Sequence, residues 1–228
     1  MTAGLVVVAD DATAGLVCAG SGFPVVGDGD ERHGDAPAVS FSPEVLADVN
    51  WLRGTSEGGR EGRTIATAGE RLWRRAPWPA ADALFEWSPS GANVAVVGDG
   101  EAAAVVERLR EGGVEVDSVP RLATRELEAA AVVIFAGAAG DPLPAEVPAV
   151  LAAGRILVTT PRSPDFGLRA GIDHCVGPGA GDLADLALSA ARHPRAFESM
   201  RAYGRLAAER HRASRVLADL AADLELGL

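Results

Sequence analysis

A glycine-rich turn in the middle of the chain has the residue types and spacing to bind phosphate. Residues 94–103 read VAVVGDGEAA, which fits the pattern G-x-G-x-x-A between an expected strand and an expected helix. Gly98 and Gly100 would let a phosphate approach the backbone N–H groups at the start of that helix. Against this interpretation, Asp99 and Glu101 would place two negative charges beside the phosphate, and tight turns require glycine without any ligand.

An acidic residue further along the chain gives the same turn a second interpretation. Asp117 lies 19 positions after Gly98, at the end of an expected strand over Val114–Val116. In dinucleotide-binding folds, an acid at the end of this strand accepts a hydrogen bond from a ribose hydroxyl. Gly98, Gly100, Ala103 and Asp117 therefore also suit an NAD(P)-binding Rossmann protein, with NAD(P) as its cofactor.

The basic residues exclude reactions that depend on lysine. Lysine is absent from the chain, and the Lys and Arg count of 21 is all arginine. Schiff-base chemistry, a Walker lysine and a lysine general base are thereby excluded. Cys18 and Cys175 have no C-x-x-C partner, and the four histidines show no metal-binding spacing. The sequence predicts no metal site.

Composition indicates a folded protein that avoids nucleic acid. The 228 residues are 48% hydrophobic and 23% charged, and their net charge of -11 repels a phosphate backbone and anionic lipid. No apolar run reaches the roughly 18 residues needed to span a membrane. The first apolar run, Leu5–Val8, has no basic residues before it, so we interpret it as a buried strand and expect a cytoplasmic protein.

Short apolar strands alternate with helical stretches along the chain, which predicts an α/β fold with parallel, Rossmann-like sheets and helices on both faces. Runs such as Val94–Val97 and Val132–Phe135 are apolar at every position, as expected for strands covered on both sides. The expected strands are 5–9, 23–26, 38–41, 94–97, 114–116, 132–135, 156–159 and 174–176.

Helices are predicted from caps and apolar periodicity. Ser42-Pro43-Glu44 precedes an expected helix over Val45–Leu52, and Asp182 is expected to cap a helix over Leu183–Ala191. One or two amphipathic helices are expected over Pro194–Leu226, and the glycine-rich segment Gly54–Gly62 is expected to be a loop.

An internal repeat is a further hypothesis. From Leu5 and again from Val132, a strand leads to an Ala-rich helix, a second strand, an acid-capped helix and an Arg-rich helix with an internal glycine. The Arg-rich helix of the first copy would be REGRTIATAGERLWRR, residues 60–75. Turn residues near 86–92 divide the chain into residues 1–88, a partial repeat unit, and residues 89–228. Two unrelated βαβ units would give the same pattern.

The second segment resembles the C-terminal, nucleotide-sugar-binding half of a GT-B glycosyltransferase, of the family-4 and spore-maturation type. The resemblance extends from VAVVGDGEAAAVVERL through PAVLAAGRILVTTP and GDLADLALSAARHP to RAYGRLAAERHRAS, about 60% of the chain. It implies a donor site at the carboxyl ends of the strands, where arginine and helix N-termini neutralise a diphosphate without metal. The residues implied are Gly98, Asp99, Gly100, Arg121, Asp141, Arg162 and Ser163, of which Arg162 is the best candidate for a phosphate contact.

Departures from that family's pattern bear on activity. Its two glutamates, eight positions apart, correspond to Asp141 and Ala149, so the residue expected to hold the donor ribose is absent. The chain is also shorter than two complete domains of that architecture. We therefore expect a degenerate or partner-dependent protein, and the alternatives are an NAD(P)-binding protein and a non-catalytic accessory subunit. Four tryptophans in the first segment favour a homodimer, and association with a full-length glycosyltransferase is the other partner hypothesis.

Overall fold

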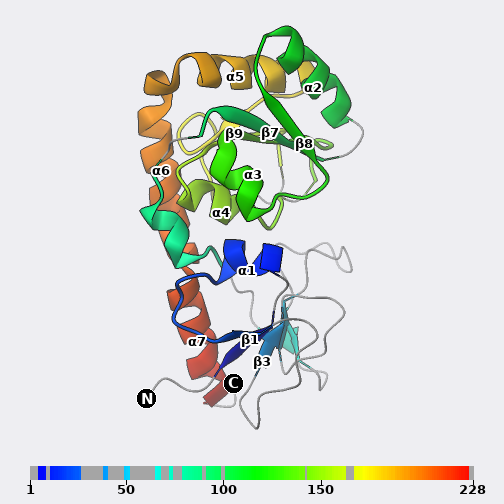
Figure 1. Cartoon of the computed structure of the whole chain (residues 1–228). Coiled ribbons are helices and arrows are strands. Elements are labelled where there is room, and N and C mark those ends of the chain that lie inside the picture. The colour runs from blue at the N-terminus through cyan, green and yellow to red at the C-terminus, as the bar shows by residue number, and fades with distance from the viewer. Residues whose placement is uncertain are drawn as a thin grey trace. The chain divides into compact units, whose positions relative to one another are not determined.

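The computed structural model of the chain divides into two compact units (Figure 1). Unit 1 combines residues 1–84 with residues 210–228, and unit 2 comprises residues 85–209. The C-terminal residues thus belong to the unit formed by the first 84, whereas the expected segments, 1–88 and 89–228, kept them with the second part of the chain. The structure describes residues 5–8, 11–26, 38–40, 49–51, 65–67, 72–73, 79–88, 91–98, 101–141, 143–162 and 167–225.

Unit 2 contains a five-stranded sheet in which all neighbouring strands are parallel. The strand order is β11-β10-β9-β7-β8. Counted from the first strand of the unit this is 2-1-3-4-5, the order of a doubly wound sheet, in which the connections change direction between the first and third strands. The strands are β7 (Asn93–Val97), β8 (Val116–Val119), β9 (Ala130–Phe135), β10 (Ile156–Thr159) and β11 (Cys175–Val176).

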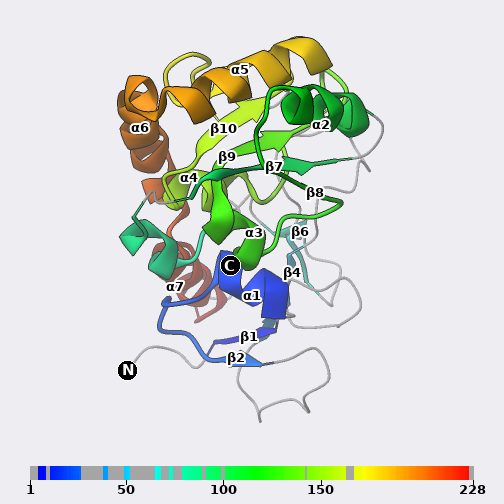
Figure 2. The ribbon, with the colours of Figure 1, turned by 45° about the horizontal axis from the view of Figure 1, so that its top comes forward.

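Helices cover both faces of this sheet (Figures 1 and 2). On one face α2 (Glu101–Glu111) and α5 (Ala180–Arg192) lie side by side. On the other lie the short helices α3 (Thr124–Ala129) and α4 (Val147–Ala152), and α6 (Glu198–Ala208) packs against α4. The expected α/β class, with parallel strands and helices on both faces, is therefore confirmed.

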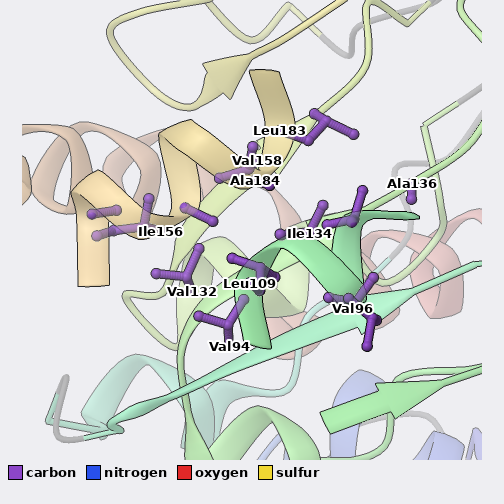
Figure 3. Close-up of a cluster of buried hydrophobic side chains, with 14 of the residues drawn as sticks. Val94, Val96, Leu109, Val132, Ile134, Ala136, Ile156, Val158, Leu183 and Ala184 are labelled. Carbon is purple, nitrogen blue, oxygen red and sulfur yellow. The ribbon is translucent and has the colours of Figure 1, made fainter. Parts of the chain in front are cut away.

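The core of unit 2 explains why its central strands are almost entirely apolar. Alternate residues of β7, β9 and β10 point toward α2 and α5, where Leu109 and Leu183 pack on them (Figure 3). The intervening residues Ala95, Val133 and Leu157 are also fully buried. Because both faces exclude water, both sets of positions favour apolar side chains, although Thr159 at the end of β10 is buried as well.

Unit 1 contains a six-stranded sheet of order β2-β1-β3-β4-β5-β6. Its first four strands are parallel, whereas β4–β5 and β5–β6 are antiparallel pairs. The helix α1 (Asp11–Val17) follows the first strand. The strands are β1 (Val6–Val8), β2 (Val25–Val26), β3 (Ala38–Ser40), β4 (Val49–Trp51), β5 (Ile65–Thr67) and β6 (Leu72–Trp73).

Two helices expected in unit 1 are wrong where the structure describes them. Residues 49–51, inside the expected helix Val45–Leu52, form β4, and β5 and β6 lie inside the expected Arg-rich helix 60–75. The described residues are rich in Val, Ile, Thr and Trp, which favour a pleated strand once a neighbouring strand is available. The Arg-rich helix of the first copy is lost with this correction, and the repeat stays a prediction. The expected loop Gly54–Gly62 lies outside the described residues.

Unit 1 is completed by α7 (Ala213–Glu225), whose N-terminus is tied to residues 80–82. The Ser214 backbone N–H donates to Asp82 Oδ2 and its hydroxyl donates to Asp82 Oδ1, both at 2.7 Å. Ala80 exchanges backbone hydrogen bonds with His211 and Ala213. Short 3-10 helices are formed by Asp82–Glu86, by Pro194–Phe197 before α6, and by Glu209–His211 before α7. In the described part of the chain, no helix is both long and apolar enough to cross a membrane.

Candidate functional site at the carboxyl edge of the unit 2 sheet

The segments that follow β7, β9 and β10 meet at the carboxyl edge of the unit 2 sheet. Doubly wound sheets bind ligands at this edge, beside the position where the connections change direction. In unit 2 that position lies between β7 and β9. Gly98 follows β7, Gly137 lies two residues after β9, and Arg162 lies three residues after β10. We call the neighbourhood of these three residues the carboxyl-edge site.

Gly98 has a structural reason to be glycine. Its φ is +135°, and a Cβ atom there would lie 2.2 Å from the backbone oxygen of Ala136. The Ala136 N–H donates to the Val97 carbonyl at 3.0 Å, which holds the two segments together. Close backbone contact at the end of β7 therefore requires glycine whether or not a ligand binds. Asp99, Gly100 and Ser163 lie outside the described residues.

Arg162 is held by a main-chain carbonyl and by one carboxylate. Its Nη2 donates to the Phe135 carbonyl, at the end of β9, at 3.0 Å, and its Nη1 lies 3.5 Å from Asp141 Oδ2. The Arg162 side chain is only 5% exposed, and its Nε is buried with no hydrogen-bond partner in the described part of the chain. Of the residues predicted from sequence, Arg162 and Asp141 are therefore brought into contact.

Burial and nearby carboxylates act on Arg162 in opposite directions. Removal from water lowers the pKa of the Arg162 guanidinium, while the charges of Asp141 and Glu101 raise it. The guanidinium nevertheless remains protonated, as arginine does in proteins generally. A buried cation whose main ionic partner is a half-exposed carboxylate at 3.5 Å can accept a further anion.

Gly137 is a site residue that the sequence interpretation missed. A Cβ atom at this position would lie 2.9 Å from Arg162 Nη2 and 3.3 Å from Asp141 Oδ2. The absence of a side chain thus lets both charged groups lie directly on the backbone after β9. The only signal in the sequence is a glycine just beyond an apolar run, which is shared by many turns.

Arg121 lies at the same edge of the sheet, after β8, and is exposed. No hydrogen bond or ion pair among the described residues joins it to Gly98 or Arg162. Because β8 is separated from β10 by β7 and β9, Arg121 stands apart from the Arg162 side of the site.

Asp117 does not stand where the NAD(P) interpretation requires. β8 begins at Val116 and ends at Val119, so Asp117 lies near its amino end, opposite Ala95. Its Oδ2 accepts a hydrogen bond from Asn93 Nδ2 at 3.1 Å. The expectation that Asp117 ends its strand is therefore wrong, because the strand starts two residues later than its valines suggest.

The helix α5 begins at the same edge, after β11. It starts at Ala180 with Gly179 as its N-cap residue, so the expected capping by Asp182 is wrong and Asp182 lies in the first turn. The Gly177 N–H donates to the Thr159 carbonyl at the end of β10. The segment before α5 therefore lies beside β10, the strand that precedes Arg162. Among the described residues, no group of three or more His, Cys, Asp and Glu could hold a metal ion.

Comparisons with known proteins add little to this geometry. No protein-family model matches the chain, and no curated protein sequence matches it. A solved structure, the crystal structure of TarM, matches with 12% sequence identity and a TM-score of 0.36. The match covers 59% of this chain and 28% of TarM, so the chain corresponds to less than a third of that protein. A likeness at this level assigns neither a substrate nor an activity.

The fold and the carboxyl-edge site together define an α/β protein with a doubly wound parallel sheet in residues 85–209. Its candidate ligand site contains a buried arginine beside the change of direction in that sheet.

Proposed function

We propose that unit 2 binds the diphosphate of a nucleotide sugar at the carboxyl-edge site, as a glycosyltransferase-like protein. The buried Arg162 guanidinium carries this proposal. It lies at the edge where doubly wound sheets bind ligands, and the carboxylate that it contacts, that of Asp141, is half exposed.

A diphosphate suits this arginine because guanidinium groups bind phosphate oxygens through parallel, charge-assisted hydrogen bonds. The firm anchor of Arg162 is the Phe135 carbonyl, which leaves Nη1 and Nε as the donors available to an anion. The start of α5 adds backbone N–H groups at the same edge, and partial positive charge at a helix N-terminus favours anions.

The nucleotide sugar, as opposed to another diphosphate, is supported by the order of elements from Asn93 onward, which resembles the C-terminal half of GT-B glycosyltransferases. Ala149 is buried within α4 and carries no carboxylate for a donor ribose. We therefore expect the isolated chain to bind a nucleotide sugar weakly and to need a partner for turnover.

Calorimetric titration of the purified chain with UDP-, GDP- and dTDP-glucose tests the proposal, without metal and then with Mg²⁺. We expect one of these ligands to bind. Arg162→Met should lower the affinity for that ligand by roughly ten- to a hundredfold, since charge-assisted hydrogen bonds contribute about 1.5–3 kcal/mol. Arg108→Met is the matched control, because Arg108 is an exposed arginine of unit 2 paired with Asp185.

Two results would contradict the proposal. One is the absence of binding by all three nucleotide sugars, and the other is an affinity that Arg162→Met leaves unchanged. Binding of NAD(P) alone would favour the alternative cofactor, although the position of Asp117 argues against it. Retention of the chain on an immobilised full-length glycosyltransferase, with no nucleotide binding, would favour an accessory subunit.

A further inference from the structure

We infer that Asp141 competes with the ligand for Arg162, so that a diphosphate binds by replacing the Asp141 carboxylate and not by joining it. This inference rests on the proposed function and assigns Asp141 a role opposite to that of a ligand-binding residue. It follows from the unequal way in which the two charged groups are held.

Arg162 is fixed, whereas its partner is not. The Arg162 side chain is buried and anchored on the Phe135 carbonyl, but the Asp141 side chain is 51% exposed. Moving Asp141 into water costs little, because an exposed carboxylate is already largely solvated. Moving Arg162 would leave the Phe135 carbonyl without this donor. The carboxylate is therefore the member of the pair that a ligand can replace.

The contact itself is loose. The Nη1 to Oδ2 separation of 3.5 Å lies at the upper limit for a hydrogen bond, whereas the bond to the Phe135 carbonyl is 3.0 Å. Charge-assisted bonds between guanidinium and a well-placed oxyanion are shorter, near 2.7–2.9 Å. A phosphate oxygen at ideal distance would therefore bind Arg162 more strongly than Asp141 does.

The backbone beside Asp141 need not open for this exchange. The Gly140 N–H donates to the Pro161 carbonyl at 2.8 Å, and the Asp141 N–H donates to the Ala138 carbonyl at 3.3 Å. These bonds hold the segment after β9 against the segment after β10. Rotation of the Asp141 side chain alone would release Arg162, and Gly137 has no side chain to block the vacated position.

A second carboxylate also acts on an incoming anion. Glu101, at the start of α2, acts on the charge of Arg162 from a different element. An anion that enters while Asp141 remains in place is therefore repelled by both of these carboxylates. Comparison of UDP with UMP tests whether a second phosphate adds to the affinity.

The test compares the wild-type chain with Asp141→Asn, using the nucleotide sugar found to bind, together with UDP and UMP as probes. We expect Asp141→Asn to bind the diphosphate ligands roughly two- to fivefold more tightly, which is the range of a single exposed ion pair. Asp185→Asn is the matched control, since it removes one exposed carboxylate of unit 2 that pairs with Arg108. It should leave the affinity unchanged.

The outcomes separate this inference from the proposed function. If the wild-type chain binds and Arg162→Met weakens binding, but Asp141→Asn weakens it or leaves it unchanged, the competitor role is overturned and the proposed function stands. If Asp185→Asn tightens binding as much as Asp141→Asn, net charge explains the effect and the competitor role is again overturned. If no variant binds any probe, both the proposed function and this inference fail.

Discussion

The guanidinium carbon of Arg155 lies 5.7 Å from the centroid of the Trp87 ring, within the range of a cation–π contact. Arg155 is only 2% exposed, and its guanidinium donates to three main-chain carbonyls, those of Leu127, Glu128 and Ser88. One arginine therefore joins the end of α3 to the segment that enters unit 2. Burial lowers the pKa of Arg155, and the charges of neighbouring arginines lower it further.

Arg155→Met should destabilise unit 2 by about 2–4 kcal/mol, because it leaves one buried and two part-buried carbonyls without this donor and removes a buried side chain. Urea unfolding measures the effect. Arg155→Lys should recover only part of the stability, since an ammonium cannot match the fork of a guanidinium. Arg108→Met, which breaks an exposed ion pair, should cost less than about 1 kcal/mol. Equal losses for the two methionine variants would contradict this explanation.

Gly204 should not tolerate a methyl group. A Cβ atom there would lie 2.9 Å from Leu151 Cδ2 and 3.0 Å from the Asp173 carbonyl oxygen, where α6 packs against its neighbours. We expect Gly204→Ala to cost about 1–2 kcal/mol in urea unfolding, even though alanine favours a helix. Gly181→Ala in α5 meets no atom within 4 Å and should be neutral or slightly stabilising. A Gly204→Ala variant as stable as the wild type would refute the close packing.

The Arg169–Asp173 pair predicts a dependence of stability on pH. The Arg169 side chain, which donates to both Asp173 oxygens at 3.1 and 2.9 Å, holds the pKa of that carboxyl below its usual value. Asp173 therefore stabilises the fold above the unfolded pKa, about 3.9, and the contribution is lost as the pH falls through the lower folded pKa. The difference in urea midpoint between the wild type and Asp173→Asn should be largest near pH 7 and shrink toward pH 3. A difference that stays constant would disprove the linkage.

Both cysteines should be unreactive in the folded protein. Burial raises the pKa of Cys18 to about 12 and that of Cys175 to about 11, so the reactive thiolate is almost absent at pH 8. A disulfide reagent such as dithionitrobenzoate should release no thiolate dye from the native chain and two equivalents in urea. Cys18→Ser should reduce the yield in urea to one equivalent. Rapid labelling without denaturant would show that a thiol is accessible.

The unit 2 sheet could be predicted from sequence because burial on both faces leaves a strong signal. β10 has the expected bounds, Ile156–Thr159, since every residue of that run is apolar or small and a glycine precedes it. β8 was harder to place, because it is an edge strand with the polar residues Asp117 and Ser118 within it. The bounds of β8 follow from its pairing with β7, in which Val116 lies opposite Val94 and Val119 opposite Val97.

Unit 1 could not be predicted as well. Residues 60–75 contain five arginines and were expected to form an Arg-rich helix, yet β5 and β6 pair there in antiparallel fashion. Local propensity is a weak guide for such segments, because the choice between helix and strand depends on whether a strand edge, here that of β4, is available.

The position of Arg162 in the candidate site could be predicted from sequence, but its contact with Asp141 could not. The position of Arg162 after a buried strand indicates a place at the carboxyl edge. Its contact with Asp141, 21 positions earlier, depends on the neighbouring placement of β9 and β10 and on the absence of a side chain at Gly137. Such a contact has no local signature in the sequence.

The tie between Asp82 and Ser214 joins residues 132 positions apart, on either side of the whole of unit 2. During synthesis, unit 2 emerges as one continuous stretch and can begin to fold while unit 1 still lacks α7. The cap on α7 must then close a loop that contains an already compact body, which costs less entropy than closing the same length of free chain. Unit 1 is therefore expected to complete its fold after unit 2, so that a defect in the folding of unit 2 would also delay unit 1.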